Sequence, residues 1–246
     1  MVKGPISHPG TKIAPLLNHD GIRSFYDTVY YEDVRLAGEI PANLRRLAAR
    51  LGPWKGKRLL DVACGTGQWL RAATELGGIP TGIDISHVAI DACRRSLPQA
   101  ELHCGPAERL PFEDHRFDFV SCLGSLEHFL EPERALREMV RVAKSSAAVL
   151  LLVPNADFIV RRLGLFSGTH QAQIREQALT LEAWQTLFES AGLEVDRRWR
   201  DLHILSRSWI FRGRWYAWPL RLAQALILPF WPLSWQYQVF HLCRIK

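Results

Sequence analysis

Residues 59–68 read Leu59-Leu60-Asp61-Val62-Ala63-Cys64-Gly65-Thr66-Gly67-Gln68. The apolar run predicts a buried strand, and the small residues after it predict a tight turn into a helix. Such a turn lets a ligand approach the backbone, and the start of the helix offers N–H groups that have no partner within the helix. The stretch therefore indicates a nucleotide-type binding loop in an α/β fold.

Short apolar segments and helical patterns alternate on both sides of this loop. The predicted strands are residues 58–63, 80–84, 101–105, 117–123 and 147–153, and the predicted helices are 41–51, 68–76, 86–96 and 132–143. This alternation is typical of βαβ units on a parallel sheet. A further helix at 180–191 precedes a strand at 193–199, and the last strand is 236–245. We expect a Rossmann-like doubly wound sheet, mostly parallel with an antiparallel C-terminal strand, with helices on both faces and a C-terminal aromatic-rich insertion.

Two ligand classes compete for the loop. Asp84 ends the strand after the loop, where a carboxylate can accept hydrogen bonds from the hydroxyls of a ribose. A dinucleotide fingerprint, G-x-G-x-x-G, would need a third glycine where Leu70 stands. The sequence thus disfavours a nicotinamide dinucleotide.

A second pattern includes the same residues. Asp61, Ala63, Gly65 and Gly67 resemble motif I of the class I S-adenosylmethionine-dependent methyltransferases, in the type 11 or quinone-methyltransferase-like subgroup. Residues 105–112 resemble the family's loop beside the adenine, and residues 117–142 resemble its motif IV and the helix after it. The resemblance implies S-adenosyl-L-methionine as the cofactor. It also implies a cofactor-binding set made of Asp61, Ala63, Gly65, Gly67, Asp84, Ile85, Ala107, Glu108, Leu123 and Tyr26.

The sequence departs from the family pattern at several positions. Pro106 stands where the family often has an Asp that accepts from the adenine amino group, so the N–H of Ala107 is expected to serve instead. Gly124 stands where related quinone O-methyltransferases have a metal-binding Glu, and we expect no metal. Ala63 replaces a frequent glycine.

Methyl transfer from a sulfonium is an in-line displacement, so the protein mainly positions the acceptor. If the acceptor is a hydroxyl, a base assists by taking its proton. His128 is the first candidate base, because it follows the fourth strand at the edge where open α/β sheets bind ligands; a helix-capping or core histidine is the alternative. His170 lies in the connection after the fifth strand and is a candidate acceptor contact, otherwise an exposed loop residue.

Other polar side chains have two interpretations each. Tyr26, Tyr30 and Tyr31 precede the core, where related enzymes fold an N-terminal segment over the cofactor, and simple packing is the alternative. Asp61 is expected to orient the methionine end of the cofactor, or else to make a structural hydrogen bond to backbone N–H groups. Glu127 is assigned a structural role.

The C-terminal part of the chain is basic and rich in tryptophan. Residues 196–246 contain nine Arg or Lys against two Asp, and six of the nine tryptophans, in a chain whose net charge is +6. Four explanations are open: a cap over the acceptor pocket, peripheral contact with a membrane surface through 206–235, a homodimer interface, and nucleic-acid binding. The last is disfavoured because no RNA-binding module is visible.

Composition limits the class and the compartment. With 48% apolar and 23% charged residues, the 246-residue chain is neither disordered, collagen-like nor a coiled coil. Five cysteines without framework spacing favour reduced thiols. Residues 1–17 lack the apolar stretch of a signal peptide, and the apolar window 220–233 falls short of the roughly 20 residues of a spanning helix. We expect a cytoplasmic protein, alternatively one held at the inner membrane face.

Four regions follow from these patterns: an N-terminal helical lid segment at 1–57, a cofactor-binding methyltransferase core at 58–201, a basic aromatic cap insertion at 202–235 and the final sheet strand at 236–246. The expected activity is O-methylation of a small molecule or glycan. The alternatives are methylation of a lipid-linked or quinone acceptor at the membrane surface, and a non-catalytic module that binds the cofactor.

Overall fold

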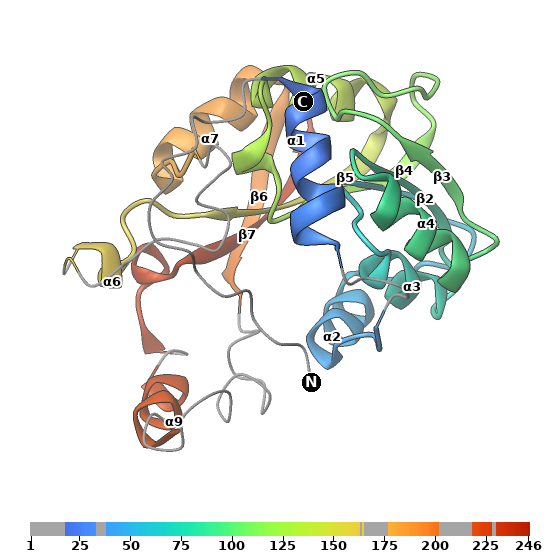
Figure 1. The fold of residues 1–246 in the computed structure, drawn as a ribbon. Helices are drawn as coiled ribbons and strands as arrows, with labels where there is room; N and C mark the ends of the chain where they lie inside the picture. Colours follow the sequence, from blue (N-terminus) through green and yellow to red (C-terminus); the bar gives the residue numbers. More distant parts are fainter. Residues whose placement is uncertain (1–17, 33–37, 163, 165–176, 202–217, 228–229) are drawn as a thin grey trace.

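The computed structural model describes residues 18–32, 38–162, 164, 177–201, 218–227 and 230–246. These residues include a seven-stranded sheet with the order β3-β2-β1-β4-β5-β7-β6 (Figure 1). The strands are β1 (Arg58–Val62), β2 (Ile79–Asp84), β3 (Glu101–Cys104), β4 (Phe117–Leu123), β5 (Ala143–Pro154), β6 (Leu193–Arg200) and β7 (Gln238–Ile245). Strands β1 to β5 pair in parallel, and β7 is antiparallel to both β5 and β6. The predicted Rossmann-like sheet with an antiparallel C-terminal strand is confirmed.

The strand order fixes where a ligand can bind. From β1, the chain builds the sheet outward through β2 and β3 on one side and then through β4 and β5 on the other. The carboxyl ends of β1 and β4 therefore flank the position where the order reverses. In open α/β sheets this is the position at which ligands bind.

Some of the helices begin at residues whose side chains cap them. Ser86 accepts a hydrogen bond from the N–H of Ala89 at the start of α4, and Thr180 accepts one from Ala183 at the start of α7. The helices of the described residues are α1 (His19–Phe25), α2 (Ala42–Leu51), α3 (Gln68–Thr74), α4 (His87–Ser96), α5 (Pro132–Val142), α6 (Ile159–Arg162), α7 (Leu181–Ser190) and α9 (Trp218–Ile227). A π-helical turn spans Tyr26–Tyr30, and 3₁₀ turns span Leu126–His128 and Leu233–Trp235.

Strand β5 starts well before its predicted first residue. β5 begins at Ala143 and not at residue 147, directly after α5, and Ala143 pairs with Phe117 before the register shifts. Ser145 and Ser146 are exposed in this extension. Because its polar residues carry no apolar pattern, the extension left no strand signal in the sequence.

Two apolar clusters cover the two faces of the sheet. Leu59 and Leu60 are neighbours in β1 and point to opposite faces, as alternate side chains of a strand must. One cluster joins the sheet to α5 and α7 and includes Leu60, Val120, Leu136, Met139, Trp184 and Phe188. The other joins it to α2, α3 and α4 and includes Leu59, Leu47, Trp54, Trp69, Leu70 and Ile90. This confirms helices on both faces.

Within the described ranges, none of the helices combines the length and the apolar character that crossing a membrane requires. The helix α9 belongs to the predicted insertion, and Figure 1 shows it well apart from the sheet, beyond the start of β7. Residues 202–217 and 228–229 of that insertion lie outside the described residues.

Candidate cofactor-binding site

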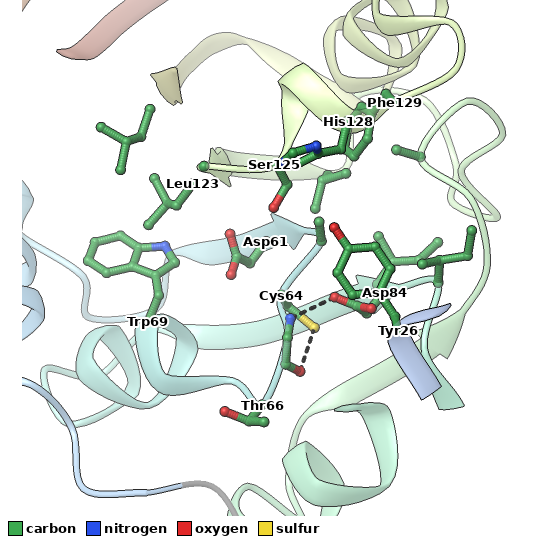
Figure 2. A pocket seen from close by; sticks show the side chains of 18 of the residues that line it. Tyr26, Asp61, Cys64, Thr66, Trp69, Asp84, Leu123, Ser125, His128 and Phe129 are labelled. Atoms are coloured by element: carbon green, nitrogen blue, oxygen red, sulfur yellow. Dashed lines mark hydrogen bonds between the residues drawn. The ribbon is translucent and has the colours of Figure 1, made fainter. Parts of the chain in front are cut away.

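A cavity of about 740 Å³ opens at the carboxyl ends of β1, β2 and β4. Its walls come from the loop after β1, the end of β2, the loop after β3, the turn after β4, the N-terminal segment and β7. Figure 2 shows several of the side chains that line it. The structure brings most of the predicted site residues to this one cavity: Tyr26, Asp61, Ala63, Gly65, Asp84, Ile85, Ala107, Glu108, Leu123 and His128.

The loop after β1 depends on left-handed backbone angles. Ala63, Gly65 and Gly67 have φ values of +61°, +54° and +80°. Such angles suit glycine and cost alanine about 1 kcal/mol. The alanine at position 63 is thus a strained substitute for the glycine that is frequent in the family.

Gly67 is the one residue of the predicted cofactor-binding set that does not line the cavity. It precedes α3, and a Cβ at this position would lie 2.3 Å from Sγ of Cys93. The glycine is therefore required by packing against α4. Its assignment to cofactor binding stays a prediction beside this packing role.

Asp84 ties the loop to the end of β2. Its Oδ2 accepts a hydrogen bond of 2.8 Å from the N–H of Gly65 (Figure 2), and its Oδ1 accepts one of 2.9 Å from the N–H of Ser86. Burial raises the pKa of Asp84 to about 6, although both backbone hydrogen bonds favour the ionised form. Each oxygen keeps a further lone pair that can accept from a ligand hydroxyl.

Asp61 is held by a side-chain relay. Its Oδ1 accepts a hydrogen bond of 2.7 Å from the hydroxyl of Ser121, and the same hydroxyl oxygen accepts one of 2.9 Å from Nε1 of Trp69. Burial raises the pKa of Asp61 to about 7, and the Ser121 hydrogen bond opposes that rise. Sequence reasoning missed Ser121 and Trp69; the signal was a lone serine in the buried strand Phe117–Leu123.

Glu108 joins three parts of the wall. Its Oε1 accepts hydrogen bonds from the N–H groups of Leu130, at 3.0 Å, and Glu131, at 3.3 Å, where α5 begins. Its Oε2 lies 3.1 Å from Nε2 of His19 in the N-terminal segment. The buried carboxylate therefore connects the loop after β3 to both α5 and α1.

The N-terminal segment is fastened beside the loop. Nε of Arg23 donates to the carbonyl of Ile85 at 3.3 Å. Oδ1 of Asp27 accepts from the hydroxyl of Ser86 at 2.6 Å and from the N–H of Val88 at 3.3 Å.

The rings of Tyr26, Tyr30 and Tyr31 pack on one another and line the cavity, and burial raises the pKa of Tyr26 and of Tyr31.

His128 ends the 3₁₀ turn after β4 and lines the cavity, although it is only 7% exposed. Figure 2 shows it beside Ser125 and Phe129, across the cavity from Asp84 and Thr66. Glu127 in the same turn is buried and does not line the cavity; its carbonyl accepts from the N–H of Gln177 at 2.8 Å. A backbone hydrogen bond thus connects the turn to the segment at Gln177.

The C-terminal strand supplies a wall that the sequence did not predict. Gln238 and Phe240 of β7 line the cavity, together with Leu152 of the neighbouring β5. They reach it because β7 inserts between β5 and β6. The other lining residues missed in the sequence include His19, Asn43, Leu44, Cys64, Thr66, Trp69, Ser125, Phe129, Leu130 and Asp201.

Residues 60–151 match the model of a family described as a methyltransferase domain. These residues are therefore similar to the class I methyltransferase domains of the type 11 group. A ubiquinone biosynthesis O-methyltransferase of Coxiella burnetii is 33% identical over 157 residues, which are 57% of this chain and 65% of that protein. A demethylmenaquinone methyltransferase of Staphylococcus aureus is 37% identical over 114 residues, 44% of this chain and 47% of that protein. The chain thus spans less than two thirds of the length of either relative.

The chain also resembles solved structures in its fold. A chain from the Haloferax volcanii complex between the Trm112 methyltransferase activator and a methyltransferase gives a TM-score of 0.70 at 17% identity, covering 92% of this chain and 97% of that one. At so low an identity the likeness establishes the fold alone.

S-adenosylmethionine is the cofactor that the family and the fold imply. The cavity of the methyltransferase domain fits it chemically. Asp84 offers lone pairs to ribose hydroxyls, and Asp61 offers a carboxylate to the ammonium of the methionine end. The loop also passes close to Tyr31, whose Oη would lie 3.0 Å from a Cβ built at Gly65.

The prediction for His170 and the prediction about a metal have no structural outcome. His170 lies outside the described residues, so its place relative to the methyltransferase domain is undefined. Among the described residues, no group of three or more His, Cys, Asp or Glu side chains is placed to hold a metal ion. Gly124, at the position of the metal-binding Glu in related enzymes, lines the cavity.

Proposed function

We propose that the protein transfers a methyl group from S-adenosylmethionine to a hydroxyl of a small molecule or glycan. The observation that carries this proposal is the shared cavity of Asp61, Asp84 and His128. Two carboxylates suited to the cofactor and one imidazole suited to a proton meet in it. Its volume of about 740 Å³ lies within the range of small-molecule sites.

The cofactor, once bound, supplies an electrophilic methyl group. In our proposal Asp84 accepts hydrogen bonds from the ribose hydroxyls and Asp61 holds the ammonium. Ala63, Gly65, Ile85, Ala107 and Leu123 form the surrounding contacts. The predicted lid is the segment 1–57; in its described part, Arg23 of α1 hydrogen-bonds to Ile85 after β2, and Asp27 of the π-helical turn hydrogen-bonds to Ser86 before α4.

His128 is the proposed general base. Its imidazole would accept the proton of the acceptor hydroxyl as the new O–C bond forms, so that no alkoxide need exist beforehand. Apolar side chains that line the same cavity would exclude water from the acceptor: Leu123, Phe129, Leu152 and Phe240. His170 is the second proposed acceptor contact.

A second acceptor class has its own support. The relatives from Coxiella burnetii and Staphylococcus aureus carry names that refer to ubiquinone and demethylmenaquinone. A quinone or other lipid-linked acceptor is therefore the alternative, and a non-catalytic cofactor-binding module is the third candidate. The three are distinguished by which acceptor, if any, gains label from methyl-labelled cofactor.

The test of the base uses three variants. His128→Ala is expected to lower kcat by roughly 100-fold or more while the Kd for S-adenosylmethionine stays unchanged. His128→Gln keeps a polar side chain of similar size and should be as slow. The matched control is His87→Ala, because His87 is exposed on α4 and does not line the cavity. Full activity of both His128 variants would remove the general-base proposal, and absence of cofactor binding by the unmodified chain would remove the methyl-transfer proposal.

A further inference from the structure

An apolar stripe runs along the exposed face of α9. Trp218, Leu222 and Leu226 are spaced by four residues and so lie on one side of the helix. Their exposed fractions are 37%, 48% and 66%, and Phe230, which follows the helix, is 86% exposed. Trp235 is 38% exposed, so residues 218–235 contribute five of the nine exposed large apolar side chains in the described part of the chain. Such clustering marks an interaction surface.

The sequence on both sides of this stripe carries charge of one sign. Residues 202–246 contain no Asp or Glu, whereas Arg207, Arg212, Arg214 and Arg221 all belong to the insertion 202–235. A protein partner usually meets a rim of mixed polar groups. Apolar residues with tryptophans at the ends and arginines as the sole charges instead suit a lipid interface whose headgroups are anionic.

The stripe is connected to the cavity through a fixed segment. Nδ2 of Asn155, at the end of β5, donates to the carbonyl of Ser234 at 2.7 Å and to that of Gln236 at 3.3 Å. Asn155 and Gln236 are 1% and 3% exposed, so this junction is buried. β7 then begins at Gln238, which lines the cavity. α9 itself stands away from the sheet (Figure 1), so its stripe is available to a surface outside the methyltransferase fold.

We propose that the stripe formed by Trp218, Leu222, Leu226 and Phe230 docks the protein on an anionic lipid surface. Its apolar side chains insert at the boundary between headgroups and acyl chains, and Arg221 of the same helix contacts the headgroups. The docking places β7 and its cavity-lining residues near the membrane. It is independent of the methyl-transfer proposal, since binding to lipid needs neither cofactor nor acceptor.

The experiment is co-sedimentation of the full chain with two kinds of vesicle, without cofactor. One kind is phosphatidylcholine alone, and the other contains about one third phosphatidylglycerol. The chain should bind the anionic vesicles and lose affinity as salt is raised, because the headgroup contacts are screened. The double variant Leu222→Ser/Leu226→Ser should bind at least about tenfold more weakly, because two apolar insertions are lost.

The matched control is Leu76→Ser. Leu76 is a comparably exposed leucine, at 46%, and it is far from α9 in the sequence. It should bind vesicles like the unmodified chain, and thermal unfolding should be cooperative and alike in all three proteins. The proposal is overturned if the unmodified chain ignores anionic vesicles, or if the double variant binds them equally well. Light scattering supplies a further outcome that overturns it. If the unmodified chain is a dimer, the double variant is a monomer and neither protein binds lipid, the stripe is a dimer interface.

Discussion

The hydroxyl of Ser121 donates a hydrogen bond of 2.7 Å to the carboxylate of Asp61, in a place where both side chains are at most 3% exposed. Ser121 belongs to β4 and Asp61 to β1, so the bond joins the two strands at the reversal of the sheet order. Burial favours the neutral form of Asp61 and the hydrogen bond favours the charged form. The balance leaves a carboxyl group that titrates near neutrality, on the wall of the cofactor cavity.

Cofactor affinity should therefore depend on pH. Burial raises the pKa of Asp61 from 3.8 to about 7 and that of Asp84 from 3.8 to about 6. Both groups are mainly protonated at about pH 5 and ionised at about pH 8, and only the ionised forms attract the ammonium and accept fully from the ribose. The Kd for S-adenosylmethionine should fall as pH rises through this window, with release of protons.

Calorimetry at about pH 6 in two buffers of different ionisation enthalpy measures that proton release. The unliganded protein should show the opposite trend in stability. Because the folded-state pKa values lie above the unfolded value of 3.8, these carboxyls stabilise the fold at low pH and the contribution is lost as pH rises through about 6 to 7. A Kd that stays flat between about pH 5 and pH 8 would contradict the assignment of both carboxylates to the cofactor.

Removal of the Ser121 hydroxyl should displace this pH dependence. Ser121→Ala deletes the hydrogen bond that holds the pKa of Asp61 down, so the midpoint of the affinity profile should move upward by roughly half a pH unit or more. The variant also leaves Nε1 of Trp69 buried without its acceptor, which should lower the free energy of unfolding by about 1–3 kcal/mol.

The matched control for this variant is Ser145→Ala, since Ser145 is exposed on β5 and outside the cavity. It should change neither the profile nor the stability measurably. A Ser121→Ala protein that loses stability but keeps the original pH midpoint would show that Ser121 supports the fold without tuning Asp61.

The sequence predicted the sheet because its strands carry local signals. Leu59 and Leu60 belong to an apolar run that predicts a buried strand, and Ser86 and Thr180 are the first residues of two predicted helices, which they cap in the structure. The motif residues Asp61 and Asp84 could be placed because strand ends of a parallel sheet meet at one edge. These parts of the site are set by local pattern and by topology together.

Other parts of the site depend on contacts between distant segments. Ser121 meets Asp61 across a gap of 60 residues, and Glu108 meets His19 across 89. Phe240 reaches the cavity because β7 lies between β5 and β6. No periodicity in a single segment encodes such pairings. Gly67 is a residue of the sequence motif, yet the reason for a glycine there also lies in a distant segment. The space that a side chain at position 67 would need is occupied by Cys93.

The packing role of Gly67 can be separated from backbone strain. Gly67→Ala places a methyl group 2.3 Å from Sγ of Cys93, at a φ of +80°. The control Gly56→Ala meets the same kind of strain at a φ of +74° with nothing within 4 Å. The control should lose about 1 kcal/mol of unfolding free energy, and Gly67→Ala should lose about 2 kcal/mol more, because α3 and α4 must move apart.

Cys93→Ala supplies the deciding comparison, since it removes Sγ and leaves a Cβ that would lie 3.5 Å from the new methyl group. In a double-mutant cycle measured by urea unfolding, Gly67→Ala should cost less in the Cys93→Ala background, with a coupling of about 1–2 kcal/mol. The residual cost should approach that of Gly56→Ala, because only the left-handed angle then remains. Additive losses would mean that Sγ of Cys93 is not what excludes a side chain at position 67. Cofactor binding by the loop would then be the favoured explanation for this glycine.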